Sequence, residues 1–397
     1  MSAPKHLVMV TRALPHHSIG GMEAVAWDLA TEFVRRGVAV TVLTAAISGK
    51  PEAFIDDGVH IRALRGTAWQ HYGRQWWRAT RRVFEEELLS TCDIVLSVSG
   101  GGYGLLPLRS SAPNLPFVFQ AHGTSIGEAV SKWKSGSPRG LITSGRNVVW
   151  IARDLAAYRK FDAIVAVGTR VAEDFSIWPI ANFVDTSRLR LIPNGIDTRL
   201  FCPNADARTR MRRELGLTED MTVVASVCRL HKQKGVDLGL DAISLRAKET
   251  GKICYLVVGD GPESDSLISK ARRMSLSDVV RFTGAVGREK VADYLNAADA
   301  MLFLTRRVEG NPLNILEALS VGLPVIASEH LKQTIPPSKD IKLVDPYSAL
   351  NVASALRSTV NLNSPRMSLL PRRFSLSESA NAYLNLFGEL MLRRHRV

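Results

Sequence analysis

Two glutamates, Glu309 and Glu317, belong to a segment whose pattern predicts a strand, a turn, a helix and a second strand. Residues 300–304 form an apolar run typical of a buried parallel strand. Pro312 fits the first turn of the helix, where its missing N–H costs nothing. A helix that starts at the carboxyl end of a parallel strand attracts anions, and carboxylates there can accept hydrogen bonds from sugar hydroxyls. Spacing alone does not separate this interpretation from two solvated surface glutamates.

Two cations follow another predicted strand, residues 222–227. Arg229 and Lys234 flank a turn that leads into a helix from Val236. A guanidinium offers a planar fork and an ammonium offers a point charge, and this combination suits a diphosphate. A solvated basic turn is the common alternative.

The first half of the chain also places small or polar residues after strands. Gly20 and Gly21 lie between a strand and a helix, where glycines let backbone N–H groups approach a ligand closely. They do not form G-x-G-x-x-G, so a dinucleotide site is weakly indicated, and such a pair is usually only a turn. His122 follows the apolar residues 116–120. A lone histidine there is most often structural, but its place at a strand end favours a site.

Length and composition predict a globular protein of two domains. The chain has 397 residues, which is more than one ordinary core holds, and no apolar run long enough to span a bilayer. The apolar stretch near the N-terminus is too short for a secretory signal, so we expect a cytoplasmic protein. Four cysteines without metal-type spacing indicate a reducing compartment and small buried side chains.

A net charge of +13 suggests an anionic partner, such as a nucleotide diphosphate, an anionic lipid surface or nucleic acid. No nucleic-acid motif is present. Aromatic residues alternate with arginines over residues 69–84, and with Lys132, Trp133 and Lys134 they are candidates for peripheral contact with an anionic membrane. The interpretation we favour is a domain helix with inward tryptophans and solvated arginines. Residues 99–104 and 131–145 are expected to be flexible loops.

The segment around the two glutamates is similar to a known family element. Glu309 and Glu317, followed by the Gly-Leu-Pro-Val-Ile-Ala ending of residues 322–327, resemble the E-x7-E element of retaining glycosyltransferase family 4. Two departures are visible. Gly310-Asn311-Pro312 stands where the family usually has Gly-Phe-Gly, and Cys228 stands where it has glycine.

This resemblance implies an α/β protein with the GT-B fold, which has two Rossmann-like domains facing across a cleft. Residues 193–197, Pro-Asn-Gly-Ile-Asp, resemble the junction between domains. We therefore expect an acceptor-side domain at 1–198 and a nucleotide-sugar-binding domain at 199–375. Residues 376–397 are expected to form a helix that crosses back to the first domain.

The resemblance also implies roles for the residues introduced above. Arg229 and Lys234 would bind the diphosphate, Glu317 the ribose, and Glu309 the donor sugar, with His122 on the other side of that sugar. Further contacts are expected in the glycine pair, in the segment after Glu309 and in the loop that holds the base: Gly20, Gly21, Gly310, Asn311, Pro312, Leu313, Gly284 and Val286. Residues 329–334 diverge from the family's second glycine-rich segment.

The function implied is transfer of a sugar from a nucleotide-diphosphate sugar to an acceptor hydroxyl, with retention of configuration and without a metal or cofactor. The expected donor is a UDP-sugar rather than a GDP-sugar, and the acceptor is a glycan, a glycolipid or a small molecule. Two alternatives remain, a GT-B nucleotide-sugar epimerase and a non-catalytic nucleotide-sugar-binding subunit. The first differs from a transferase in its products, and the second binds without transfer.

Overall fold

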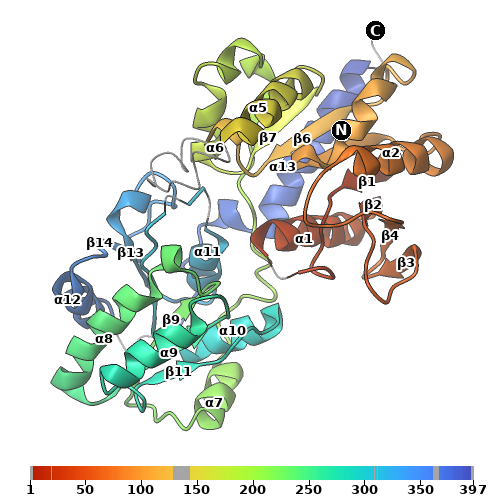
Figure 1. Ribbon diagram of the computed structural model, residues 1–397. Helices are drawn as coiled ribbons and strands as arrows, with labels where there is room; N and C mark the ends of the chain where they lie inside the picture. Colours follow the sequence, from red (N-terminus) through yellow and green to blue (C-terminus); the bar gives the residue numbers. More distant parts are fainter. Residues whose placement is uncertain are drawn as a thin grey trace. The chain divides into compact units, whose positions relative to one another are not determined.

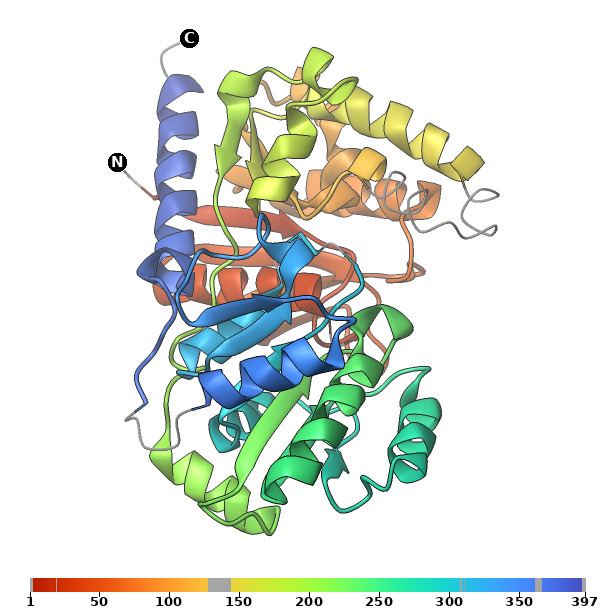
Figure 2. The ribbon, with the colours of Figure 1, turned by 90° about the vertical axis from the view of Figure 1, so that its left-hand side faces the viewer.

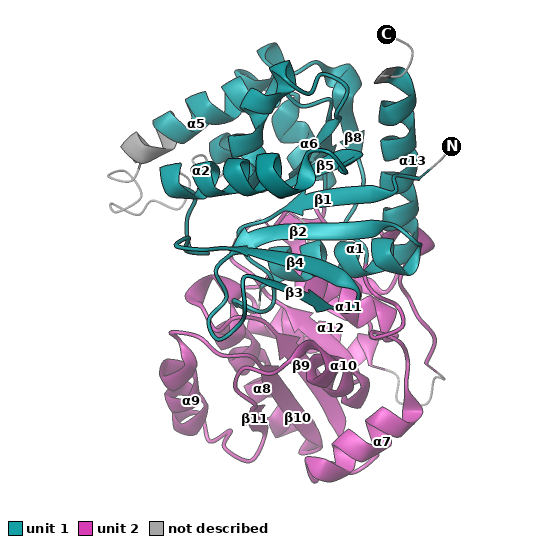
Figure 3. Cartoon of the chain, turned by 90° about the vertical axis from the view of Figure 1, so that its right-hand side faces the viewer, with its two compact units in different colours: residues 1–195, 376–397 teal, residues 196–375 magenta. Residues whose placement is uncertain are grey.

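The computed structural model describes residues 3–18, 20–127, 144–307, 309–310, 312–360 and 366–394. The chain divides into two compact units, coloured separately in Figure 3. Unit 1 comprises residues 1–195 and 376–397, and unit 2 comprises residues 196–375. The sequence predicted a boundary at residue 198, and the units divide between Gly195 and Ile196.

Unit 1 is built on an eight-stranded sheet with the order β3-β4-β2-β1-β5-β6-β7-β8. Neighbouring strands are parallel except β3, which runs antiparallel to β4 at the edge. The central strands are buried apolar runs, as expected for a parallel sheet covered on both faces. The strands are β1 (His6–Val10), β2 (Ala39–Ala45), β3 (Ala53–Asp56), β4 (Val59–Leu64), β5 (Ile94–Val98), β6 (Phe117–Ala121), β7 (Ala163–Ala166) and β8 (Leu189–Leu191).

Helices cover this sheet (Figure 1). The longest of the described helices, α13, lies beside α1, where Arg36 donates to the carbonyl and hydroxyl of Ser377 at 3.0 and 2.9 Å. Figure 2 shows α13 next to the strands of unit 1. The helices are α1 (Gly21–Arg35), α2 (Arg74–Val83), α5 (Ser144–Tyr158), α6 (Thr169–Phe175) and α13 (Leu376–Arg394), with a π-helical turn at Phe84–Leu88 and 3-10 turns at Ile180–Asn182 and Thr186–Arg188.

The prediction of a flexible loop at residues 99–104 was wrong. Ser99–Ser110 is a 3-10 helix whose glycines pack against the backbone. A Cβ on Gly101 would meet the carbonyl oxygen of Val10 at 2.4 Å, and the N–H of Gly102 donates to the hydroxyl of Ser97 at 2.8 Å. These glycines are required for close approach and not for mobility. The other predicted loop, 131–145, lies almost entirely outside the described residues, as do Lys132, Trp133 and Lys134.

Unit 2 holds a six-stranded parallel sheet with the order β11-β10-β9-β12-β13-β14. Helices alternate with its strands, the pattern of a doubly wound α/β domain. The expectation of two parallel-sheet α/β domains is confirmed. The strands are β9 (Thr222–Val227), β10 (Ile253–Val258), β11 (Val280–Phe282), β12 (Ala300–Phe303), β13 (Val325–Ser328) and β14 (Ile341–Val344). The helices are α7 (Ala205–Glu214), α8 (Val236–Thr250), α9 (Ser264–Arg273), α10 (Arg288–Ala297), α11 (Leu313–Ser320) and α12 (Ala349–Thr359), with 3-10 turns at Lys232–Lys234, Glu329–Leu331 and Arg372–Phe374.

A buried carboxylate ties together the amino edge of this second sheet. Asp299, just before β12, accepts hydrogen bonds from Arg208 at 2.9 Å, Arg212 at 3.3 Å and Arg366 at 3.1 Å. It also accepts one from the backbone N–H of Val223 at 2.7 Å. The Asp299 side chain is 4% exposed, so its charge is compensated by these guanidinium groups and not by water.

We expect Asp299→Asn to destabilise unit 2, because three guanidinium groups would lose their buried counter-charge. The loss should be about 3–5 kcal/mol, the usual effect of breaking a buried ion pair, and should appear as a lower urea midpoint. The control is Asp220→Asn, which removes the exposed pair with Lys252 and should leave the midpoint nearly unchanged. Equal midpoints for the two variants would contradict this account.

Candidate active site

The residues expected to bind a diphosphate lie at the carboxyl edge of the sheet of unit 2. Strands β9 and β12 are neighbours and parallel, so the segments that follow them start side by side. Arg229 follows β9 and is exposed, and Lys234 ends the 3-10 turn before α8. Gly235 has a φ of +66°, and a Cβ there would meet the carbonyl oxygen of Leu304 at 1.8 Å. Only glycine allows the turn after β9 to lie this close to the end of β12.

Lys234 and Glu309 meet in an ion pair across these two segments. The ammonium nitrogen lies 2.7 Å from Oε1 of Glu309, which also accepts a hydrogen bond from the hydroxyl of Thr305 at 3.4 Å. The two side chains are 26% and 18% exposed, so the pair is partly screened from water but reachable by a ligand. The structure thus brings together the cation predicted for the phosphate and the carboxylate predicted for the sugar.

The backbone around this pair is held by a second ion pair. Arg306 contacts both carboxylate oxygens of Asp237 at 2.7 Å, and this interaction raises the pKa of Arg306. The N–H of Arg306 and the hydroxyl of Thr305 both donate to the carbonyl oxygen of Gln233, at 2.7 and 3.0 Å. These contacts fix the loop after β12 against the turn that carries Lys234. Sequence reasoning did not single out Arg306, Asp237 or Thr305, because their partners are about 70 residues away along the chain.

Glu317 lies in α11 and is only 8% exposed, so the alternative of a solvated surface glutamate is wrong for this residue. Its helix is tied to β9 by Asn314, whose amide donates to the carbonyl oxygen of Val227 at 2.6 Å. Pro312 is buried at the N-cap of α11 and makes no side-chain hydrogen bond to the first turn. The N–H groups of that turn are therefore suited to an anion, and Leu313 is its first helical residue.

The remaining residues predicted for unit 2 lie on either side of these groups. Gly310 is partly buried just before α11, and Asn311 lies outside the described residues. Gly284 follows β11, two strands from β9, and its carbonyl oxygen accepts from the N–H of Gly259 at 3.0 Å. Val286 packs against the core. The loop after β11 is thus anchored to the loop after β10 at the same edge of the sheet.

In unit 1 the predicted residues follow β1 and β6. Gly20 caps α1 in an extended conformation without a side-chain cap, and Gly21 is the first helical residue. His122 follows β6, and its Nε2 lies 3.0 Å from Oε1 of Gln120. Burial lowers the pKa of His122 to about 4, so the imidazole is neutral at physiological pH.

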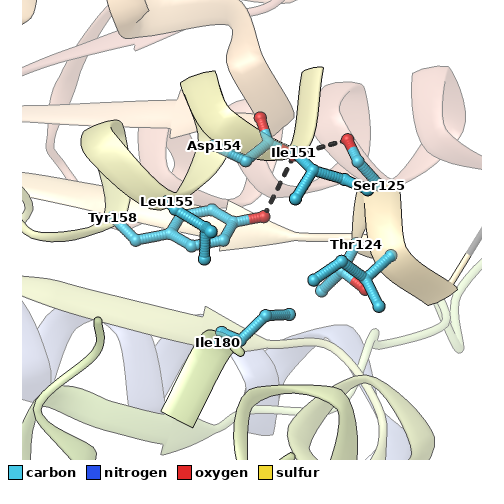
Figure 4. A pocket seen from close by; sticks show the side chains of 8 residues that line it. Thr124, Ser125, Ile151, Asp154, Leu155, Tyr158 and Ile180 are labelled. Atoms are coloured by element: carbon cyan, nitrogen blue, oxygen red, sulfur yellow. Dashed lines mark hydrogen bonds between the residues drawn. The ribbon is translucent and has the colours of Figure 1, made fainter. Parts of the chain in front are cut away.

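Two buried aspartates hold the segment directly after His122. Asp174 of α6 accepts from the hydroxyl of Thr124 at 2.9 Å, and Asp154 of α5 accepts from that of Ser125 at 2.5 Å. Figure 4 shows Asp154 between Ser125 and Tyr158, whose hydroxyl also donates to it at 3.3 Å. Desolvation raises the pKa of both carboxylates. The space among these side chains is nearly filled, so they position the histidine segment and do not form a ligand pocket.

Solved structures of other proteins have a fold similar to that of this chain. Sucrose-phosphate synthase from Thermosynechococcus elongatus has a similar structure, with a TM-score of 0.71 and 20% sequence identity over 99% of this chain and 98% of that chain. This similarity establishes the fold, and the chain has the GT-B fold that the sequence predicted.

The chain matches the models of two glycosyltransferase families. Residues 19–200 match Glycosyltransferase Family 4, and residues 207–369 match Glycosyl transferases group 1. The two matched stretches correspond closely to the amino-terminal part of unit 1 and to unit 2. The chain belongs to the glycosyltransferases of family 4 and group 1, as its E-x7-E element indicated.

Two curated relatives illustrate the range of this family. The chain is 31% identical over 235 residues to the GDP-mannose-dependent alpha-(1-6)-phosphatidylinositol monomannoside mannosyltransferase of Mycobacterium tuberculosis, covering 56% of this chain and 60% of that protein. It is 28% identical over 331 residues to the D-inositol 3-phosphate glycosyltransferase of Actinosynnema mirum, covering 78% and 76%. The chain thus spans little more than half the length of the mycobacterial relative it matches.

We expect His122 to remain neutral well below neutral pH. Its NMR titration, assigned with a His122→Gln variant, should have a midpoint near pH 4. Because the folded-state pKa lies below the ordinary value of 6.5, the neutral ring contributes stability above pH 6.5 that is lost as the pH falls toward 4. A midpoint close to 6.5 would show that the ring is not desolvated.

Proposed function

We propose that this chain transfers a sugar from a nucleotide-diphosphate sugar to an acceptor hydroxyl, with retention of anomeric configuration. The observation that carries the proposal is the ion pair between Lys234 and Glu309, which joins the segments after β9 and β12 at one edge of the sheet. Arg229 follows β9 in the same segment as Lys234, and Glu317 is buried in α11. Two cations and a helix N-terminus suit a diphosphate, and two carboxylates suit the hydroxyls of its sugar and ribose.

The reaction depends on stabilising the leaving group. The bond between the anomeric carbon and the phosphate oxygen breaks, and its electron pair stays on the nucleoside diphosphate. Arg229 and Lys234 compensate this growing negative charge, where fixed charges are more effective than mobile solvent. The acceptor oxygen bonds to the same face of the anomeric carbon, and its proton passes to the departing phosphate oxygen. This proposal assigns no protein nucleophile and no metal ion.

Before the donor binds, Lys234 and Glu309 are paired with each other, and each then exchanges this partner for a group of the donor. With the donor bound, Lys234 turns its charge toward the diphosphate, and Glu309 accepts hydrogen bonds from the sugar hydroxyls. Glu317, held in the buried part of α11, accepts from the ribose hydroxyls. His122, as a neutral ring, contacts the sugar without adding a charge. The preference for a uridine over a guanosine base stays a prediction.

The names of the relatives bear on the epimerase alternative, and the loop before α11 bears on the alternative of a non-catalytic binding subunit. Both curated relatives are named as transferases, which supports transfer over epimerisation. A non-catalytic binding subunit would keep the nucleotide contacts and lose the sugar contacts, and the departure at residues 310–312 is where such a loss would occur. Product analysis with a broad acceptor panel separates the three functions.

We further propose a cytoplasmic location with peripheral contact to an anionic membrane through α2. Among the described residues, no helix has the length and apolar character needed to cross a membrane. The tryptophans of α2 face inward: Trp76 is 2% exposed and donates to the carbonyl oxygen of Gly101 at 2.9 Å. Any membrane contact therefore rests on cations. Arg78, Arg81, Arg153 and Lys160 line a cavity of about 380 Å³ between α2 and α5, a place suited to an anionic headgroup.

The diphosphate assignment predicts a large loss of turnover on removing either cation. Arg229→Ala and Lys234→Ala should each reduce kcat about a hundredfold or more, the usual effect of losing a transition-state charge contact. The matched control is Lys232→Ala, which removes an exposed cation from the same turn and should keep most of the activity. Full activity in either test variant would refute the assignment.

The membrane proposal predicts salt-sensitive sedimentation with anionic liposomes. The full chain should pellet with vesicles containing an anionic lipid at low salt and be released at high salt, because exposed charges are screened. Neutral vesicles and the double variant Arg78→Glu, Lys160→Glu are the controls, and both should leave the protein in the supernatant. Equal pelleting with neutral and anionic vesicles, or none with either, would contradict the proposal.

A further inference from the structure

Three large apolar side chains are exposed close together in the segment between α6 and β8. Trp178 is 79% exposed, Ile177 46% and Phe183 40%. Single exposed apolar residues are common on soluble proteins, but several in one short segment form a patch of the kind that marks an interaction surface. The proposed function gives this patch no role.

The patch belongs to an ordered part of the fold, because the same segment is anchored on its inner side. Ile180 and Val184 are buried in the core of unit 1. The N–H of Ala181 donates to the carbonyl oxygen of Ile177 at 2.9 Å, and that of Phe183 donates to the carbonyl oxygen of Ile180 at 2.8 Å. Hydrogen-bonded turns therefore hold some apolar residues in the core and leave the others in solvent.

Helix α5 lies next to this segment and supplies positive charge. Ile180 lines the same nearly filled space as Ile151 and Leu155 of α5, and Figure 4 shows the three side chains around it. Asp154, the one carboxylate between residues 149 and 160, is buried. The residues that this stretch of α5 exposes are apolar or cationic, namely Val149, Ala152, Arg153, Ala156, Arg159 and Lys160.

The carboxylates that flank the patch along the chain are paired with arginines. Arg170 lies 3.5 Å from Glu173, and Arg188 lies 3.8 Å from Asp185. These pairs compensate the negative charge beside the patch, while the cations of α5 have no exposed carboxylate on their own helix stretch. The surface is therefore complementary to a partner that is both apolar and anionic.

These properties fit an anionic bilayer better than a second copy of the chain. In a symmetric dimer both copies contribute the same patch, so the cations of α5 would approach identical cations. A stable protein interface also needs about 20–30 residues a side. A bilayer needs far fewer, because the amphipathic ring of a tryptophan is well suited to the boundary between headgroups and acyl chains.

We propose that Ile177, Trp178 and Phe183 form the apolar anchor of this chain on an anionic membrane and insert at the level of the headgroups. This inference deepens the membrane contact proposed above and rests on it, since the tryptophans of α2 face inward and its cations supply charge alone. Stable attachment of lipid-modified proteins likewise takes two signals, such as an apolar anchor and a basic patch.

Vesicle sedimentation of the full chain tests the anchor. Trp178→Ala should lower the partition coefficient onto anionic vesicles about tenfold or more at low salt, because a large apolar side chain no longer leaves water. The matched control is Ile55→Ala, which truncates a 61% exposed residue of β3, at the opposite edge of the sheet from β8. This control should bind like the wild type. Equal partition of Trp178→Ala and the wild type would overturn the proposal.

Fluorescence quenching by anionic vesicles with brominated acyl chains tests insertion directly. The emission of the wild type should fall on binding. Trp178→Phe keeps an aromatic ring, so it should pellet like the wild type and yet be quenched less. Equal quenching of the two proteins would show that Trp178 stays outside the bilayer and would overturn the proposal.

The outcomes separate the anchor from the proposals on which it rests. If the wild type pellets, Arg78→Glu, Lys160→Glu does not, and Trp178→Ala pellets like the wild type, the anchor alone fails. If the wild type does not pellet with anionic vesicles, the anchor and the membrane contact both fail, while sugar transfer to a soluble acceptor is measured separately. A wild-type dimer that Trp178→Ala dissociates without vesicles would assign the patch to a second copy and overturn the proposal.

Discussion

The contact between Lys234 and Glu309 is the interaction on which the site depends. A partly buried ammonium and carboxylate at 2.7 Å compensate each other's charge and hold two loops of unit 2 together. A ligand that separates them must offer each a partner of comparable strength, since an uncompensated buried charge is costly. In the proposed function a diphosphate linked to a sugar does this, because its phosphate oxygens suit the ammonium and its hydroxyls suit the carboxylate. On that proposal, the pair favours a ligand that carries both groups over a simple anion.

Much of this arrangement could be predicted because it follows from local patterns and the geometry of parallel sheets. Apolar runs identified the central strands, and parallel neighbours end at one edge, so residues after β9 and β12 had to meet. The turn predicted before Val236 is present, and it contains Gly235, whose left-handed backbone and close contact with the carbonyl of Leu304 admit no side chain. The family resemblance supplied what spacing did not, namely the roles that we propose for Glu309 and Glu317.

The features that were missed depend on partners distant in sequence or on packing. The glycines after β5 suggest mobility by composition, yet they lie in a 3-10 helix because Val10 and Trp77 approach their backbones closely. The sequence around Gln120 predicts only a strand residue. Its contact with Tyr383 of α13 is 263 residues away along the chain and appears only in the structure. Asp154 and Asp174 sit in helices that show no local sign of the hydroxyl groups they bind. No local pattern in one sequence reports contacts of this kind.

The most direct test is a crystal structure of the full chain with a bound nucleoside diphosphate, determined separately with UDP and with GDP. The account predicts diphosphate oxygens within hydrogen-bond distance of the guanidinium of Arg229 and the ammonium of Lys234. It also predicts ribose hydroxyls at the carboxylate of Glu317 and a longer separation between Lys234 and Glu309. A nucleotide bound elsewhere, with the ion pair intact and Glu317 out of reach of the ribose, would contradict it.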